Sequence, residues 1–341
     1  MLSSYRKKLI GFVILILIVL SSCITRNDNI ASSVQSNTIK MNSDIELVNE
    51  DETYIGKEKF KIYNFGLFES SKMFLIKSHH AVSQMLGVIV VNKDNELIIF
   101  DGGRIEDASF LIDFIKQFDG KVKYWFLTHI HDDHVGAIYE IFNNHTEDIY
   151  VENICYNFAD FSWYYERTGD DAYMLLLFEA AKTKYIDHMT NAGKVVSVNP
   201  KIKKNDTFAI DNISVKVMND IYLIDSDPIN NSSIVYKVDV ENTSMMVLGD
   251  LSYYGGDELL KDNNGVNSLK SDIVVMAHHG QAGVDYSVYE KISPKIALWP
   301  TTKNIYENQS GKFQTDETKK WMNRIGVKYN ILAYPDSVII E

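Results

Sequence analysis

The segment THIHDDHVG, residues 128–136, concentrates side chains that can bind metal ions. Imidazole nitrogens and carboxylate oxygens together form a ligand set suited to zinc and neighbouring divalent metals. Because side chains alternate along an extended chain, His129 and His131 point the same way and can hold one ion. Asp133 and His134 follow the turn into a helix and can hold a second ion. The pattern predicts a two-metal centre, and the alternative is a solvated polar loop at a strand end.

Two shorter motifs follow apolar strands later in the chain. Asp250 ends the motif LGD, and His278 and His279 stand in the motif AHHG. Taken singly, a Gly-Asp pair is typical of a turn, and a histidine pair is typical of a core or surface position. Three polar strand ends in one chain instead indicate a sheet that delivers all three groups to one edge.

The elements that position the first motif are read from apolar periodicity. Alternating apolar and polar residues predict a strand over 60–65. Segments 84–91 and 96–100 are rich in branched residues and are joined by a polar turn, which predicts a hairpin. Helical apolar spacing predicts a helix over 107–118. The next strand, 121–128, runs directly into the histidine motif.

The second half of the chain continues the alternation of helices and strands. A helical, aromatic stretch spans 156–192, and later strands are expected at 195–217, 233–240, 244–248, 272–276, 295–299 and 338–340, with a helix at 315–325. Many strand neighbours are joined by tight turns, so the sheets must be mixed. The predicted fold class is therefore α/β, with more than one sheet and with helices outside.

Composition limits the class of protein further. The chain has 341 residues, of which 45% are hydrophobic, and this is a globular composition. The two cysteines, Cys23 and Cys155, are too few for a disulfide framework or a four-cysteine zinc site. The net charge of −12 disfavours a protein that coats nucleic acid. It remains compatible with a metal centre that handles anions, because a bound dication reverses the local field.

The N-terminus has the pattern of a secretory signal. Residues 1–22 contain a basic start, a short apolar run and small residues, and they precede Cys23. The sequence LSSC resembles a bacterial lipobox, which implies lipidation of Cys23 and a location on the extracytoplasmic face of the cell membrane. The alternative is an ordinary signal anchor with an incidental cysteine. Polar residues 23–58 are predicted to form a tether to a domain over 59–341.

In this order, HxHxDH, LGD and HHG resemble motifs of the metallo-β-lactamase fold superfamily, and the resemblance spans residues 60–341. The branch it resembles is found in competence DNA-uptake proteins and in bacterial surface phosphorylcholine esterases. The resemblance implies an αββα four-layer sandwich of two mixed β-sheets flanked by helices. It also implies a dinuclear site with two Zn²⁺ ions, for which Mn²⁺ or Fe²⁺ can substitute.

The resemblance also assigns roles to individual residues. Ligand roles fall to His129 and His131 at the first metal, to Asp133, His134 and His279 at the second, and to Asp250 as the bridge between them. Asp133 would also orient the attacking hydroxide, and His278 would donate a hydrogen bond on the substrate side. The opposite assignment of His278 and His279 stays open. Asp101, in FDGG, is expected to brace the histidine loop from behind the ligands.

The chain departs from the superfamily at one point. Many members carry another first-metal histidine before the bridging aspartate, but no histidine lies between His188 and His278. Asn230, in NNSSIV, stands there instead and is expected to act behind the ligands. This departure argues against a β-lactamase or a glyoxalase II-like thioesterase. The remaining histidines, His79, His80, His145 and His188, are expected outside the site.

The resemblance implies a metal-dependent hydrolase that activates water, with a small-molecule or cell-envelope phosphoester or phosphodiester as its substrate. Alternatives are a surface nuclease acting on DNA and a zinc-binding lipoprotein without turnover. The aromatic residues Trp163, Tyr164, Tyr253 and Tyr254 suit a quaternary ammonium group such as choline. The competing interpretation of these aromatics is plain core packing.

Overall fold

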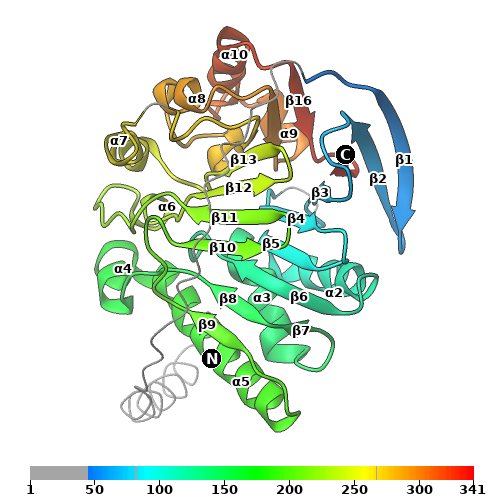
Figure 1. Cartoon of the computed structure of the whole chain (residues 1–341). Helices are drawn as coiled ribbons and strands as arrows, with labels where there is room; N and C mark the ends of the chain where they lie inside the picture. Colours follow the sequence, from blue (N-terminus) through cyan, green and yellow to red (C-terminus); the bar gives the residue numbers. More distant parts are fainter. Residues whose placement is uncertain (1–44, 81–82, 266) are drawn as a thin grey trace. The chain divides into compact units, whose positions relative to one another are not determined.

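The computed structural model describes residues 45–80, 83–265 and 267–341. The predicted signal peptide, Cys23 and the first part of the predicted tether lie outside the described residues. Two mixed β-sheets face each other, and helices cover their outer surfaces (Figure 1). The α/β class and the four-layer arrangement expected from the sequence are confirmed.

The first sheet has ten strands, in the order β1-β2-β17-β3-β4-β5-β6-β8-β9, with β7 also paired to β6. Its strands are β1 (Asn49–Ile55), β2 (Glu58–Asn64), β3 (Lys72–Leu75), β4 (Gly87–Val91), β5 (Leu97–Asp101), β6 (Lys121–Phe126), β7 (Tyr150–Val151), β8 (Asn153–Cys155), β9 (Ser197–Asn199) and β17 (Ser337–Ile340). The predicted hairpin is the antiparallel pair β4 and β5, and β6 pairs parallel to β5.

The second sheet has seven strands in chain order. They are β10 (Thr207–Ile210), β11 (Ile213–Val217), β12 (Tyr236–Val240), β13 (Thr243–Val247), β14 (Ile273–Val275), β15 (Ile296–Trp299) and β16 (Tyr329–Leu332). The strands from β10 to β13 are antiparallel, whereas β13 to β16 are parallel. The carboxyl ends of β13 and β14 therefore lie at one edge of this sheet.

Helices connect the strands and pack on the outer faces. They are η1 (Ile105–Asp107), α2 (Ala108–Lys116), α3 (Asp132–Asn144), α4 (Phe161–Thr168), η2 (Gly169–Ala172), α5 (Tyr173–Asn191), α6 (Pro228–Asn231), α7 (Tyr253–Asp262), η3 (Ala277–Gly280), α8 (Tyr286–Ile292), α9 (Lys303–Glu307) and α10 (Thr315–Ile325). Helices α2, α3 and α5 pack on the first sheet, and α7, α8 and α10 pack on the second (Figure 1).

The space between the sheets is filled by apolar and aromatic side chains. Phe100 and Phe126 of the first sheet stack at 5.3 Å between ring centroids, and Tyr236 of the second sheet lies 5.5 Å and 5.2 Å from them. All three side chains are fully buried. Burial of this apolar surface is the main force that holds the two sheets together.

Regular structure begins earlier than the predicted boundary at residue 59. Strand β1 lies within the predicted tether and pairs along its length with β2, and Ile45 is buried between the sheets. The sequence NEDETYI hides this strand because most of its side chains are exposed and polar. It is an edge strand held by backbone hydrogen bonds, so it needs no apolar face.

Among the described residues, no helix combines the length and the apolar character that crossing a bilayer requires.

Candidate metal centre

The candidate ligands lie at strand ends contributed by both sheets. The histidine motif follows β6 and continues into α3, while Asp250 follows β13 and the pair His278-His279 follows β14. Two hydrogen bonds to backbone carbonyls join the sheets beside the motif. The Ile234 amide donates to the Thr128 carbonyl at 3.0 Å, and the Tyr236 hydroxyl donates to the Leu127 carbonyl at 2.6 Å.

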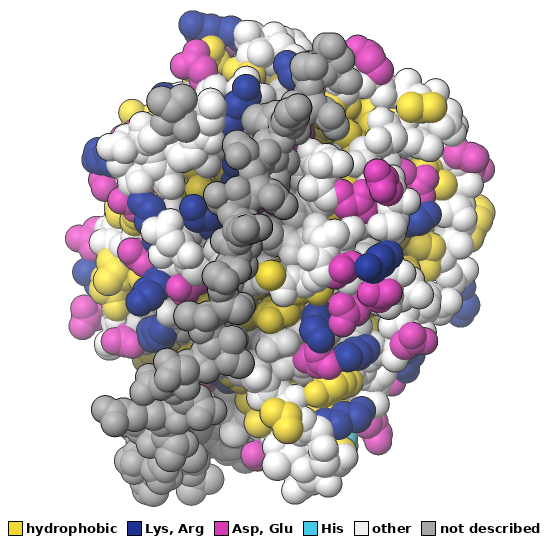
Figure 2. Space-filling model, in the orientation of Figure 1, with side chains coloured by type: hydrophobic (Ala, Val, Ile, Leu, Met, Phe, Trp, Pro, Cys, Tyr) yellow, Lys and Arg dark blue, Asp and Glu magenta, His cyan; other side chains and the backbone are white. Residues whose placement is uncertain are grey.

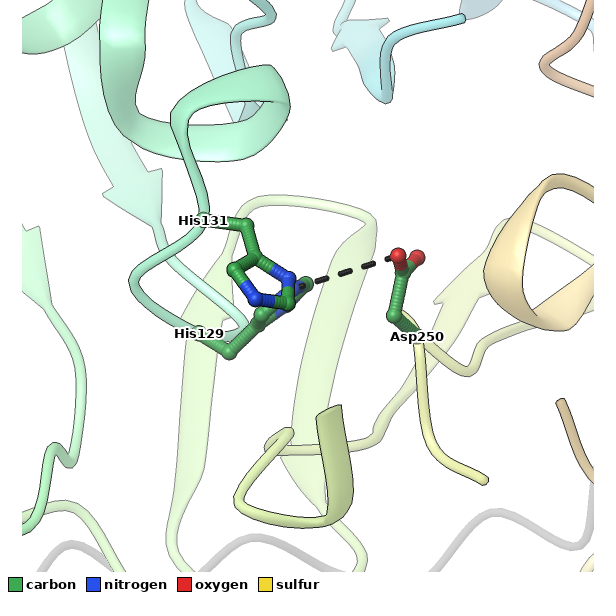
Figure 3. Close-up of side chains that lie close together, drawn as sticks. All are labelled: His129, His131 and Asp250. Carbon is green, nitrogen blue, oxygen red and sulfur yellow. Dashed lines mark hydrogen bonds and ion pairs between the residues drawn. The ribbon is translucent and has the colours of Figure 1, made fainter. Parts of the chain in front are cut away.

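His129, His131 and Asp250 form the first group of candidate ligands. Their nearest ligand atoms all lie within 4.8 Å of one another. His129 Nε2 is 3.0 Å from His131 Nδ1 and 3.9 Å from Asp250 Oδ2. Figure 3 shows both imidazoles on one loop with the Asp250 carboxylate facing them from the opposite side. This arrangement can hold one cation.

Asp133, His134 and His279 form the second group, and their ligand atoms also lie within 4.8 Å of one another. His279 Nε2 is 3.3 Å from Asp133 Oδ2. Asp250 borders this group as well, because its Oδ1 is 3.1 Å from His134 Nε2 and its Oδ2 is 3.5 Å from His279 Nε2. The Asp250 carboxylate thus lies between the two groups, where a bridging ligand would stand.

The two adjacent histidines differ in their surroundings. The His279 side chain is fully buried, and its Nδ1 donates to the Pro300 carbonyl at 2.9 Å, which turns Nε2 toward the carboxylates. The His278 side chain is 21% exposed, and its Nε2 lies 3.7 Å from Asp250 Oδ2. The geometry therefore favours His279 as the ligand and leaves His278 at the solvent side of the centre.

Unpartnered buried atoms provide a test of whether cations fit. His134 Nε2, His279 Nε2 and Asp250 Oδ1 are buried and lie close to other ligand atoms, but none of them makes a hydrogen bond of good geometry. Buried polar atoms are almost always paired, so three such atoms converging on one place need an explanation. Imidazole nitrogens and a carboxylate oxygen are typical ligands of zinc-like cations. The residues present therefore fit divalent metal ions.

A buried network behind the ligands sets which nitrogen each imidazole presents. Asp101 accepts hydrogen bonds from the Thr128 amide at 2.8 Å and hydroxyl at 2.7 Å, and its Oδ2 is 2.7 Å from His134 Nδ1. Because the Thr128 hydroxyl donates to Asp101, it accepts from His129 Nδ1, at 3.0 Å. Both imidazoles are thereby fixed with Nε2 turned toward the candidate metal position. Asp101 thus contacts His134 directly and His129 through Thr128.

The glycines of the two short motifs are required by close packing. Gly249 has φ +56°, and a Cβ there would lie 2.8 Å from the Thr128 side chain. Gly280 has φ +77°, and a Cβ there would lie 2.3 Å from the Trp299 ring. Both positions combine a left-handed backbone with no room for a side chain. LGD and HHG therefore form tight turns at the ends of their strands, and these turns direct Asp250 and His279 inward.

The electrostatics of the two groups differ. Burial lowers the pKa of His129 and His131, so both imidazoles are neutral and able to bind a cation. Burial also disfavours a charged His279, but Asp250 and Asp133 outweigh it and raise the pKa of His279 to about 9. Burial would raise the pKa of Asp250, yet the neighbouring histidines hold it well below its usual range. Burial also disfavours a charged His134, but Asp250 and Asp101 outweigh it and raise its pKa, so a cation in the second group would compete with protons for both histidines.

Asn230 lies in α6 and pairs with a residue outside the two ligand groups. Its Nδ2 donates to the Asp227 carboxylate at 2.9 Å and 3.2 Å. From the same segment, the Ser233 hydroxyl accepts from the Asp250 amide at 3.2 Å. Ser233 therefore contacts Asp250 directly. Sequence reasoning named the pattern but singled out only its asparagine.

The other histidines lie outside the two groups. His79 Nδ1 is 3.0 Å from Asp107, His145 Nδ1 is 3.1 Å from Asp148, and His80 Nδ1 accepts from the Ser83 amide at 3.2 Å. His188 lies near the end of α5. None of these four histidines belongs to either candidate ligand group among the described residues.

Two of the aromatic residues considered for a cationic ligand already contact other side chains of the protein. Tyr164 is fully buried, and its hydroxyl is 2.7 Å from the Ser232 hydroxyl. The Trp163 ring is covered by the Arg167 guanidinium, which lies 4.6 Å from the ring centroid. Tyr253 and Tyr254, at the start of α7, are 51% and 53% exposed. Core packing, the competing interpretation, describes Tyr164.

Comparison with known proteins places the chain in a family. The metallo-beta-lactamase superfamily model matches residues 87–293. A search of curated proteins gave no match. Similar solved structures include the metallo-beta-lactamase fold protein YhfI from Bacillus subtilis, with 8% identity, coverage of 79% of this chain and 99% of that chain, and a TM-score of 0.44.

Two further solved structures have comparable scores. A diphosphatase from the PhnP family has 12% identity, coverage of 80% of this chain and 97% of that chain, and a TM-score of 0.40. The subclass B3 metallo-beta-lactamase MEM-A1, from a soil metagenome library, has 15% identity, coverage of 77% and 92%, and a TM-score of 0.36. The superfamily match spans more than half of the chain and includes both candidate ligand groups. The chain therefore belongs to the metallo-beta-lactamase superfamily.

Proposed function

We propose that the protein is a two-metal hydrolase whose substrate is a phosphoester or phosphodiester. The observation that carries the proposal is the position of Asp250, whose carboxylate borders both ligand groups at distances of 3.1 to 3.9 Å. A carboxylate shared between two adjacent cation positions is one arrangement that can hold two metal ions close enough for two-metal hydrolysis. Two cations held here would supply a strong nucleophile from water at neutral pH and offset negative charge on the substrate.

The residues around the cations would orient and protonate the reactants. Asp133 belongs to the second group and is 5% exposed. Its carboxylate can accept a hydrogen bond from the attacking water and align it. His278 is the more exposed of the paired histidines and lies beside Asp250. Its imidazole can donate to a substrate oxygen or to the leaving group.

The phosphoester class is supported by the ligand count and by the motif resemblance. The first group contains His129, His131 and Asp250, and the segment that supplies another histidine in many superfamily members holds Asn230 here. This pattern resembles the branch that contains phosphorylcholine esterases. A pair of cations also suits an in-line displacement at phosphorus, since it can stabilise the attacking and leaving oxygens together.

A nuclease acting on DNA receives less support. On the uncovered part of the face shown in Figure 2, Lys and Arg side chains are interspersed with Asp and Glu. The net charge of the chain is −12. Tracking a nucleic-acid backbone calls for a gathered basic surface. A zinc-binding lipoprotein without turnover is the other alternative, and the experiment below separates it from a hydrolase.

The test is an assay of the full chain, extracted from membranes in detergent, stripped of metal and reloaded with zinc or manganese. Bis-p-nitrophenyl phosphate and p-nitrophenylphosphorylcholine serve as substrates. Turnover should require the metal, disappear in Asp133→Ala and persist in His188→Gln, a control histidine on α5. The ratio of the two rates reports any preference for choline. Two ions bound per chain without turnover of either substrate would contradict the proposal and favour acyl substrates or a binding module.

We also propose that Cys23 carries a lipid that anchors the protein to the extracytoplasmic face of the cell membrane. The proposal is supported by the sequence pattern of residues 1–23. The wild-type chain should incorporate a labelled fatty acid, whereas Cys23→Ala should not. Retention of the label in Cys23→Ala would disprove lipidation at this residue.

A further inference from the structure

Arg104 lies directly against the two aspartates of the histidine motif. Its Nη2 is 3.4 Å from Asp133 Oδ2, and its Nη1 pairs with the Asp132 carboxylate. Gln84 approaches the same oxygen of Asp133, with Nε2 at 3.3 Å. Asp133 Oδ2 thus faces the Arg104 guanidinium, the Gln84 amide and His279 Nε2, the last at 3.3 Å. Three nitrogen groups from separate parts of the chain thus surround one carboxylate oxygen.

The backbone that carries Arg104 is fixed against the helix that carries Asp133. The Arg104 amide donates to Asp107 Oδ2 at 2.8 Å, and its Nε donates to the Gln84 carbonyl at 3.2 Å. Gly136 of α3 packs so closely that a Cβ there would lie 2.9 Å from Arg104 Cα. The distance between the guanidinium and the start of α3 is therefore set by packing.

We propose that Arg104 is a positioning residue for the second metal. It holds the Asp133 carboxylate in the orientation that presents Oδ2 to His279, so that the cation meets a preformed pair of ligands. Asp132, whose side chain is 62% exposed, completes the arrangement by holding the guanidinium from the solvent side. This inference rests on the metal centre of the proposed function, and it does not depend on which substrate is hydrolysed.

The effect of removing the Arg104 charge on metal affinity distinguishes a positioning role from a purely electrostatic one. A guanidinium near a cation position repels the cation, so removal of the charge alone would strengthen metal binding. A positioning role predicts the opposite result, because an unrestrained Asp133 must be ordered when the cation binds. Removal of such a supporting partner typically weakens metal binding about 10- to 100-fold. The sign of the change therefore identifies the role.

The planar shape of the guanidinium also matters for the positioning role. Arg104 contacts Asp132 and Asp133 with different nitrogens, which a guanidinium can do at once. A lysine keeps the charge but offers one compact ammonium, which can satisfy one carboxylate well. Arg104→Lys should consequently restore only part of the affinity that Arg104→Gln loses.

The experiment titrates the metal-free full chain in detergent with Co²⁺ and with Zn²⁺ against a competing chelator. Stoichiometry, the two dissociation constants and the visible absorption of bound Co²⁺ are recorded. Arg104→Gln should weaken the second ion about 10- to 100-fold, leave the first within about twofold and alter the Co²⁺ spectrum of the second ion. Asp132→Asn should produce a smaller change in the same direction. Arg167→Gln, which removes an arginine on α4 that pairs with Asp225, is the charge-matched control.

Two outcomes overturn the inference: binding of both ions by Arg104→Gln with wild-type or higher affinity, or full recovery by Arg104→Lys. Thermal unfolding of each metal-free variant checks that it folds. If Arg104→Gln does not fold, Arg104→Lys and Asp132→Asn decide the matter. Because the readout is metal binding, a wild-type chain that binds two ions but hydrolyses no phosphoester would contradict the proposed function and leave this inference standing.

Discussion

Asp101 Oδ2 and His134 Nδ1 lie 2.7 Å apart, and neither side chain has exposed surface. The same oxygen accepts the hydroxyl proton of Thr128 at 2.7 Å, and the other oxygen accepts the Thr128 amide at 2.8 Å. Asp101 itself has φ +54°, which directs its carboxylate across the end of β6. One buried carboxylate thus fixes the orientation of ligands assigned to both groups, since Thr128 in turn contacts His129.

Asp101→Asn should therefore weaken metal binding without removing a ligand. An amide cannot accept all three hydrogen bonds, so the His134 ring loses its fixed orientation. We expect both dissociation constants to rise, that of the second ion about 10- to 100-fold. Chelator competition on the full chain measures the change, with Asp113→Asn on the exposed side of α2 as the control. Unchanged affinity for both ions would show that the network is structural only.

The paired histidines should separate into one ligand and one donor. His279→Ala should lose the second ion, because its Nε2 faces Asp133 and Asp250. His278→Ala should keep both ions and lower kcat about 100- to 10,000-fold, the range for loss of a positioned acid. Metal analysis and steady-state kinetics on both variants measure these effects. The reverse pattern would exchange the two assignments.

Gly280→Ala should destabilise the fold strongly. The new Cβ would lie 2.3 Å from the Trp299 ring, and the residue would keep φ +77°. Overpacking and left-handed strain together should lower the free energy of unfolding by about 2–4 kcal/mol. Gly311→Ala is the matched control, because its φ is +66° but no atom lies within 4 Å of the new Cβ. Urea unfolding of the metal-free chain should show a loss of only about 1–2 kcal/mol for the control.

Glu241 should make stability depend on pH in the acid range. Its carboxylate accepts hydrogen bonds from Glu69, Ser70 and Ser71, at the entry to β3. Burial raises its pKa, but these hydrogen bonds outweigh it and lower the pKa below the usual 4.5. A carboxyl with a depressed folded-state pKa stabilises the fold above the unfolded value. That contribution is lost as the pH falls from about 4.5 through the folded-state pKa.

The variant Glu241→Gln should therefore be less stable than the wild type at neutral pH. The difference between the two should shrink as the pH falls below about 4.5. Unfolding of the metal-free chain in urea at a series of pH values measures this dependence. A constant difference across the series would show that ionisation of Glu241 contributes nothing.

Removal of divalent ions should lower the unfolding temperature. An ion that binds only the folded chain stabilises it by about 2.7 kcal/mol when its free concentration is 100 times the dissociation constant. Calorimetry of the full chain with chelator, and again after zinc is restored, measures the shift. In Asp250→Ala the shift should be much smaller, because this residue contributes to the first group and borders the second. An equal shift in the variant would mean that the stabilising ion binds elsewhere.

The sequence predicts the parts of the centre that are local in the chain. Asp133 and His134 sit in one short motif, and Asp250 follows a plainly apolar strand, so pattern and strand ends were sufficient. Arg104 and Ser233 were not predicted to matter, because their contacts to Asp133 and Asp250 depend on how separate loops pack. No periodicity in the sequence reports such a contact.

The same distinction applies to the fold. Strands such as β4 and β14 are buried runs of branched residues, and they appear where the sequence places them. Strand β1 is different, because its side chains are mostly polar and β2 holds it through backbone pairing and exposed ion pairs rather than through an apolar face. A solvated edge strand has the composition of a linker, and the distinction between them depends on pairing with β2 rather than on the residues themselves.

Each ligand group combines donors from two distant parts of the chain, one after β6 and one after β13 or β14. A cation in the first group would link His131 to Asp250 as a removable cross-link. By chain entropy, closing a loop of this order is worth about 4–5 kcal/mol, comparable to a disulfide. The cysteine in the described part of the chain, Cys155, is buried and free. The local concentration of metal would then determine how strongly the two sheets are held together, as oxidation does in disulfide-bonded proteins.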